Sequence, residues 1–114
     1  DEDRLAILNY YYNCVHKNNK NPTTFNSKFD KETLEIFVNK TNFFNSAELQ
    51  SLMYNAFLKN TKEIIEKNDI NSEISIEKYH ILESLSEIKI YDRERNQQIK
   101  NNNLKDVGIK QTYN

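Results

Sequence analysis

The sequence predicts an all-α fold, a single compact domain over residues 1–114 that is built as a bundle of three to four helices. Glycine and proline, which punctuate turn-rich β-proteins, each occur once in 114 residues. Seven tyrosines and six phenylalanines supply large side chains for a hydrophobic core. A chain of this length buries roughly two-thirds of the surface that its unfolded form exposes, which is enough for a core without disulfides. The alternative left open is an α+β fold with a C-terminal antiparallel β-meander.

The first helix is predicted over residues 3–18, with Asp3 as its N-cap. Its apolar side chains recur every three or four positions and cover more than half of its girth, so we expect it to be central to the core. These side chains are Leu5, Ile7, Leu8, Tyr11, Tyr12, Cys14 and Val15. Residues 17–24 collect Asn, Pro and Thr and are predicted to form a loop.

Residues 25–44 fit two interpretations. Asp30 would cap a short helix that carries Phe37 on its apolar face. The β-branched and aromatic content of residues 34–38 would also suit a strand. The helix is the favoured interpretation.

A longer amphipathic helix is predicted over residues 45–68. Asn45 or Ser46 would cap it, and Glu48, three residues after Asn45, nearly completes a capping box. The apolar face consists of Leu49, Leu52, Met53, Ala56, Phe57, Ile64 and Ile65.

Helix and strand compete over residues 73–112. Two segments, 73–77 and 87–91, alternate apolar and polar side chains with a period of two, which is typical of strands. The turn of a tight hairpin favours Gly, Asn or Asp, and the residues that connect the two segments include none of these. A helix over about 75–100 is therefore favoured, and the polar residues 101–114 are predicted to form a mobile tail.

Charge and cysteine content bound the classes of partner. With 16 basic and 17 acidic residues the net charge is −1, so no overall field attracts nucleic acid. The single cysteine, Cys14, excludes an internal disulfide framework. No apolar run approaches the roughly 18 residues of a membrane-spanning helix. We therefore expect no membrane span, and nucleic acid is not the expected partner.

Glycine-dependent sites are excluded because Gly108 is the only glycine. Phosphate-binding loops, dinucleotide fingerprints and the nucleophile elbow each need two or more glycines at fixed spacing. No catalytic constellation stands out either, so we expect neither enzymatic activity nor a cofactor.

Cys14 and His16 are close neighbours in the sequence, but they cannot act together. Residues two positions apart point about 200° away from each other on a helix, so these two cannot share a metal ion or a proton. We expect Cys14 to be a small core residue and His16 to lie on the solvent side of the helix.

Glu77 and His80 have the Glu-x-x-His spacing that places two ligands on one helix face, as in di-metal bundles. Glu63 and Glu66 of the preceding helix could add carboxylates, and His16 could add an imidazole, although it lacks a glutamate three residues earlier. A solvated helix face is the favoured interpretation. A metal-binding helical bundle completed by dimerisation is the alternative.

Tyr10, Tyr11 and Tyr12 are predicted to provide an interaction surface. Three consecutive residues cover about 200° of a helix, so at least one ring must leave the core. We expect two rings in the core and one at its rim, where it can contact a partner. Arg93 and Arg95 are further candidate contact residues. The basic side chains of this C-terminal region also define a second alternative, weak nucleic-acid binding.

The expected function is that of a non-enzymatic protein–protein interaction module. Abundant lysine, asparagine, isoleucine and tyrosine are typical of an AT-rich genome. The chain begins at Asp1, as it would after cleavage of an export signal or after trimming. We therefore expect a secreted effector or surface protein that acts in virulence by binding a host protein, with a cytoplasmic location left open. No motif indicates a protein family, and the oligomeric state stays open.

Overall fold

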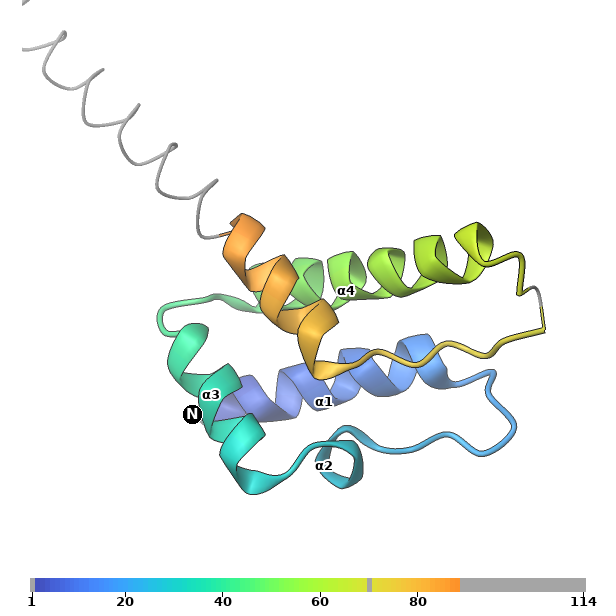
Figure 1. Cartoon of the computed structure of the whole chain (residues 1–114). Coiled ribbons are helices and arrows are strands. Elements are labelled where there is room, and N and C mark those ends of the chain that lie inside the picture. The colour runs from blue at the N-terminus through green and yellow to red at the C-terminus, as the bar shows by residue number, and fades with distance from the viewer. Residues whose placement is uncertain (1, 70, 89–114) are drawn as a thin grey trace, which may run out of the picture.

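The computed structural model describes residues 2–69 and 71–88, and within them the chain forms five helices and no strand (Figure 1). The helices are α1 (Glu2–His16), α2 (Phe25–Lys28), α3 (Lys31–Lys40), α4 (Ser46–Glu66) and a fifth over residues 78–88. The all-α prediction is confirmed. None of the described helices is both long and apolar enough to cross a membrane.

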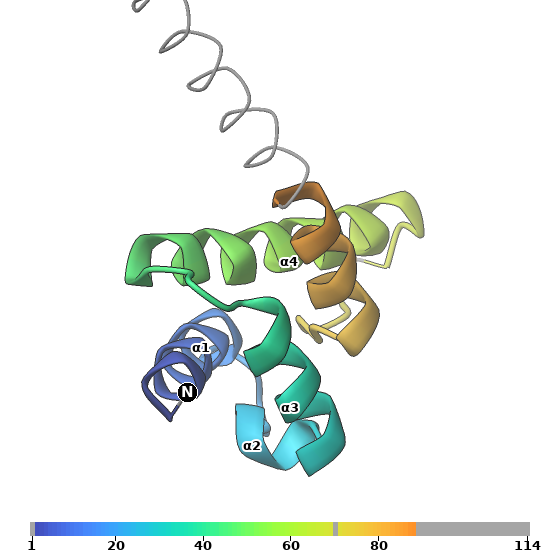
Figure 2. The same ribbon diagram turned by 90° about the vertical axis from the view of Figure 1, so that its left-hand side faces the viewer.

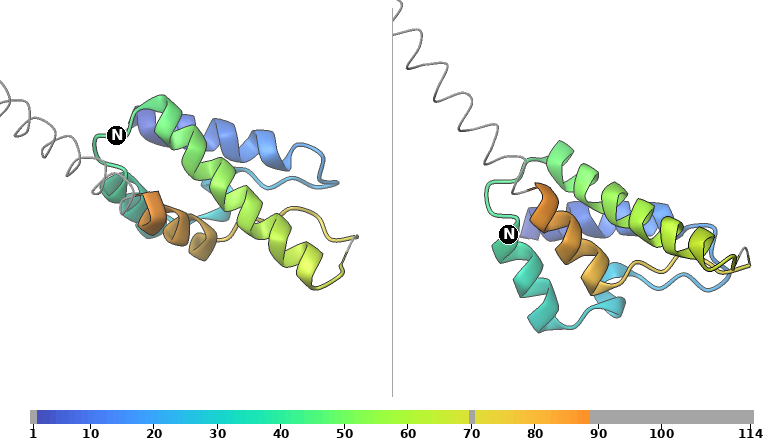
Figure 3. Two further views of the ribbon diagram at one scale, coloured as in Figure 1. Left: turned by 90° about the horizontal axis from the view of Figure 1, so that it is seen from above. Right: turned by 45° about the horizontal axis from the view of Figure 1, so that its top comes forward.

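Among the described residues the two longest helices are α1 and α4, which lie side by side and run in the same general direction (Figures 1 and 3). Because parallel neighbours cannot be joined by a short turn, the chain between them makes a return path that contains α2 and α3. Figure 2 shows this return path below α4 and beside α1. The 78–88 helix, orange in the figures, packs against α4, where Lys59 and Glu87 form an ion pair with atoms 2.6 Å apart.

The buried apolar side chains form one cluster, in which aromatic rings fill the space between α1, α2 and α3. The centroid of the Tyr12 ring lies 5.5 Å from that of Phe25 and 5.9 Å from that of Phe29. Phe37 meets Phe29 edge to face at 5.2 Å. Such aromatic pairs contribute about 0.5–1.5 kcal/mol each beyond their burial. The other buried members are Leu8, Leu49, Leu52, Met53, Ala56, Ile76, Ile81 and Leu85.

Side-chain caps fix where α3 and α4 begin. Asn45 Oδ1 accepts the Glu48 N–H at 2.8 Å and the Glu48 carboxylate accepts the Asn45 N–H at 3.0 Å, so the predicted capping box is complete. Asp30 accepts the Thr33 N–H at 2.8 Å at the start of α3, which confirms the helical interpretation there. Asp3 was wrongly predicted as an N-cap, because α1 already begins one residue before it.

The chain after α4 differs from the prediction in one respect. The last of the described helices begins at residue 78 rather than 75, and residues 73–77 form an extended run along the end of α1 (Figure 1). This run keeps the period of two, since Ile76 is buried and Ser75 is exposed, yet it joins no sheet.

A further correction concerns Ile65, which is 70% exposed rather than part of the apolar face of α4. The predicted tail, residues 101–114, lies outside the described residues.

Candidate functional site

A groove lined by uncharged side chains lies between α1 and α4, and we call it the tyrosine groove. Its volume is about 560 Å³. The lining residues are Tyr10, Tyr11, Cys14, Val15, Gln50, Ser51, Met53 and Tyr54. Tyr10 and Tyr54, one on each helix, are 62% and 56% exposed. Two large rings from different helices are therefore presented to the solvent beside one cleft.

The three consecutive tyrosines of α1 divide between this groove and the core. Tyr12 is 2% exposed, and burial raises its pKa to about 12. Tyr11 is half-buried, and Tyr10 meets it edge to face with ring centroids 5.1 Å apart. Of the three predicted contact residues, the structure thus places Tyr10 and Tyr11 at a surface groove, whereas Tyr12 is a core residue. Arg93 and Arg95 lie outside the described residues.

Cys14 and His16 occupy the opposite sides of α1 to those predicted. Cys14 is exposed in the tyrosine groove, and its hydrogen bond with Tyr10 raises the pKa of that tyrosine. His16 is 2% exposed. The signal for this correction was present in the sequence, because His16 follows Leu8 and Tyr12 at intervals of four and so continues the buried stripe.

Both ring nitrogens of His16 are hydrogen-bonded inside the protein. Nδ1–H donates to the carbonyl oxygen of Tyr12 at 2.7 Å, and Nε2 accepts the N–H of Ile76 at 3.2 Å. The imidazole also stacks on the Tyr12 ring, with centroids 3.9 Å apart. His16 therefore joins the C-terminal end of α1 to the extended run before the last helix.

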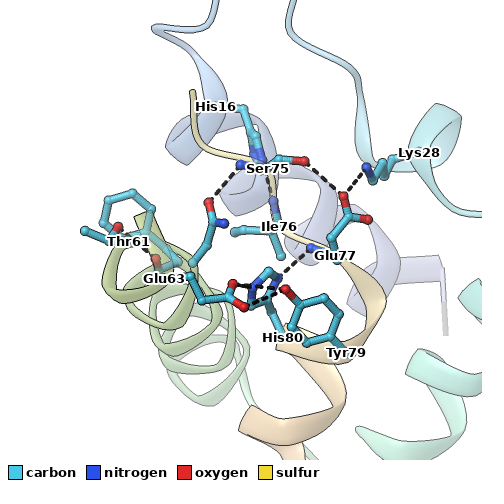
Figure 4. Close-up of polar contacts among 11 residues, drawn as sticks. His16, Lys28, Thr61, Glu63, Ser75, Ile76, Glu77, Tyr79 and His80 are labelled. Carbon is cyan, nitrogen blue, oxygen red and sulfur yellow. Dashed lines mark hydrogen bonds and ion pairs between the residues drawn. The ribbon is translucent and has the colours of Figure 1, made fainter. Parts of the chain in front are cut away.

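His80 is likewise buried, 1% exposed, and both of its ring nitrogens are engaged (Figure 4). Nδ1 accepts the Glu77 N–H at 2.8 Å, and Nε2–H donates to the Glu63 carboxylate of α4. The Tyr79 hydroxyl donates to the same carboxylate at 2.7 Å, which raises the pKa of Tyr79 to about 12. The prediction that His80 lies on a solvated face was wrong, because its ring closes the contact between α4 and the 78–88 helix.

The predicted metal ligands do not converge. Glu77 precedes the last helix, and its carboxylate accepts from Lys28 at 2.7 Å and from Ser75 at 3.0 Å, away from the Glu63–His80 contact (Figure 4). Glu66 is exposed and faces Lys62 at 3.9 Å. Across the described part of the chain there is no group of three or more His, Cys, Asp or Glu side chains that could hold a metal ion. Of the proposed pairings, only Glu63 with His80 is formed.

The Glu63–His80 pair resembles the orienting half of an acid–base site, but its geometry leaves His80 no free nitrogen. A general base needs an unoccupied ring nitrogen within reach of a substrate. In His80 the nitrogen opposite Glu63 is occupied by the Glu77 N–H. This cluster therefore joins structural elements together, and the tyrosine groove is the better candidate for contact with another molecule.

A scan against protein-family models, a search of curated proteins and a search of solved structures found no match to this chain.

Proposed function

We propose that this protein is a non-enzymatic protein–protein interaction module that binds its partner through the tyrosine groove. The observation that carries the proposal is the exposure of Tyr10 and Tyr54, 62% and 56%, on the two helices that line one uncharged cleft. Tyrosine is enriched at the energetic centres of interfaces, because its ring buries a large area while its hydroxyl finds a hydrogen bond.

The chemistry of the groove favours an amphipathic helix of another protein as the occupant. A groove between two helices accepts such a helix through apolar side chains spaced three to four residues apart. Met53 and Val15 form apolar parts of the lining, and Gln50 offers hydrogen bonds at its edge. No lining residue carries a charge at neutral pH that could select an acidic or basic motif.

The proposal has a narrower form, in which the partner is a host protein and this chain is a secreted or surface-exposed effector. Its support is compositional: the chain has 18 asparagines and a strong excess of lysine over arginine, as AT-rich genomes encode. The groove chemistry is the same in the broad and in the narrow form. The partner's cellular location distinguishes them.

The test compares three proteins: the wild type, the double variant Tyr10→Ala/Tyr54→Ala, and Phe43→Ala. Phe43 is 93% exposed and lies outside the groove, so this variant controls for non-specific hydrophobic binding by an exposed aromatic ring. Proteins captured from host-cell extract are identified, purified and titrated calorimetrically against all three. We expect the double variant to weaken binding by at least about 30-fold, as the loss of an interface hot spot does, and Phe43→Ala to bind like the wild type.

Two results would contradict the proposal. One is a captured protein whose affinity is the same for the wild type and the double variant. The other is a failure of the wild type to retain any protein that the double variant does not retain. Circular dichroism melting curves of the three proteins show whether the fold is preserved, which is expected because both mutated tyrosines are exposed.

A further inference from the structure

Residues 73–77 form an extended segment whose backbone is held by side chains rather than by a neighbouring strand. The hydrogen bonds are Asn19 Nδ2–H to Ile74 O at 2.7 Å, Ser75 N–H to Asn60 Oδ1 at 2.8 Å, Ile76 N–H to His16 Nε2 at 3.2 Å and Glu77 N–H to His80 Nδ1 at 2.8 Å. The chain has two histidines, and both bind adjacent backbone groups of this one segment (Figure 4).

Only the neutral form of His16 fits this arrangement. Nδ1 carries the proton that it donates to the Tyr12 carbonyl, and Nε2 must be unprotonated to accept the Ile76 N–H. A second proton on the ring would turn Nε2 into a donor that faces another donor. The hydrogen bond to Ile76 would then be lost inside the protein, where an unpartnered polar group is costly.

We propose that mild acid releases the 73–77 segment, because protonation of His16 breaks its hydrogen bond to Ile76 and separates the segment from the C-terminal end of α1. This is a conformational response built into the fold, and it is independent of the tyrosine groove. The side chain of Ile76 is fully buried, so its release also removes an apolar contact from the core.

The groups around His16 act in different directions on its pKa. Burial, the largest effect, lowers the pKa of His16, and Lys28 of α2 lowers it further. The Tyr12 carbonyl and the carboxylate of Glu77 raise it, but the net shift is downward from 6.5. The unfolded chain therefore binds a proton before the folded chain does. The stabilisation is complete above about pH 6.5 and is lost as the pH falls through the pKa of the folded form.

His80 differs from His16 in having a hydrogen-bonded carboxylate, that of Glu63 on α4, with Tyr79 and Glu77 beside it. A second proton on His80 would also break its hydrogen bond to the Glu77 N–H, but the new charge would meet the Glu63 carboxylate directly. Among the described contacts of His16 there is no hydrogen bond to a carboxylate. This contrast makes His16 the acid-sensitive partner of the segment.

The first test uses the unaltered chain, so no variant has to fold. Nuclear magnetic resonance follows the ring protons of both histidines and the amide protection of Ile76 and Met53 between pH 8 and pH 5. We expect His16 to titrate below 6.5, the usual value for histidine. We also expect the protection factor of Ile76, which is exposed when the segment alone opens, to be lower than that of Met53 on α4 and to fall by up to about tenfold per pH unit. A His16 titration at or above 6.5, an Ile76 protection factor that does not fall with pH, or one that equals that of Met53 at every pH would overturn the proposal.

The second test compares the variants His16→Gln and His80→Gln in urea unfolding at each pH. Glutamine keeps an oxygen that can accept the Ile76 N–H, but it does not titrate. We expect His16→Gln to abolish the dependence of the folding equilibrium on pH between about 6.5 and 5, and His80→Gln to retain it. A wild-type dependence that survives in His16→Gln would refute the inference, and the resonance titration decides it if either variant fails to fold.

Discussion

Asn60 and Ser75 lie 15 residues apart, and the side-chain oxygen of Asn60 accepts the backbone N–H of Ser75 at 2.8 Å. Asn60 is 8% exposed, so this amide belongs to the interior rather than to the solvated face of α4. An extended segment without a strand partner leaves its backbone donors and acceptors unmatched, and a buried unmatched group destabilises the fold. Asparagine, which occurs 18 times here, offers both a donor and an acceptor on a short side chain and can take the place of the missing strand.

Asn60→Ala is expected to lower the free energy of unfolding by about 0.5–1.5 kcal/mol, because the Ser75 N–H, in a partly buried hydrogen bond, loses its acceptor. The matched control is Asn55→Ala on the same helix, whose amide meets Glu87 at 3.5 Å in an exposed position. We expect the control to change stability by less than about 0.5 kcal/mol. Urea unfolding measures both, and equal losses in the two variants would count against the role assigned to Asn60.

The start of α4 should depend on its capping box. Asn45→Ala removes the acceptor of the Glu48 N–H, and helix N-cap substitutions of this kind lower stability by about 0.5–2 kcal/mol. Ser46→Ala, one residue further on, changes a neighbouring exposed side chain and leaves both capping hydrogen bonds in place. Thermal unfolding followed by circular dichroism should show a lower midpoint for Asn45→Ala alone. A midpoint that falls equally for Ser46→Ala would show that the box itself contributes nothing.

Local signals predicted the regular parts of the fold well. Asn45 and Glu48, which are three residues apart, predict the start of α4, and Asp30 predicts the start of α3. They do so because capping requires particular short polar side chains at fixed offsets. The all-α architecture followed from the scarcity of glycine and proline together with helical spacing of apolar residues. The four-residue helix that begins at Phe25 was not predicted, since so short a segment carries almost no periodicity.

The burial of the two histidines was the main failure of sequence reasoning. His16 and His80 are polar and were therefore assigned to solvent, but each satisfies both ring nitrogens within the protein. Their partners Ile76 and Glu63 are 60 and 17 residues away, and such distant pairing leaves no mark on local periodicity. Only the α1 side of the tyrosine groove was predicted from the sequence. Tyr54 of α4 was not identified, because its place in the groove depends on how the two helices pack.

A second loss of stability is expected at lower pH, from carboxylates rather than histidine. Hydrogen bonds from His80 and Tyr79 lower the pKa of Glu63 below its usual 4.5. A carboxylate with a lowered pKa in the folded state stabilises the protein above about pH 4.5, and this contribution is lost as the pH falls through the folded value. Glu63→Gln should therefore flatten the decline in stability between about pH 4.5 and 3.

The control for this decline is Glu66→Gln on the same helix. Glu66 is exposed and its carboxylate lies 3.9 Å from the Lys62 amine, so a surface pair of this kind adds little. Urea midpoints at half-unit pH intervals should coincide for Glu66→Gln and the wild type. If Glu63→Gln followed the same curve as the wild type, the Glu63–His80–Tyr79 contact would have no part in acid stability.

Phe43 presents the opposite case, a residue whose replacement should stabilise the protein. It lies in the turn between α3 and α4, which is closed by the Phe44 N–H and the Thr41 carbonyl oxygen at 3.0 Å, and its φ is 69°. The left-handed region costs a residue with a Cβ atom about 1–2 kcal/mol, and a ring that is 93% exposed returns no packing energy. Phe43→Gly removes that strain at an entropic cost of about 0.5–1 kcal/mol in the unfolded chain, so a net gain of about 0.5–1 kcal/mol is expected. Phe43→Ala keeps the Cβ atom and should leave the free energy of unfolding within about 0.5 kcal/mol of the wild type. Urea unfolding measures both variants. If alanine stabilised the protein as much as glycine does, the effect would come from the exposed ring and not from the backbone.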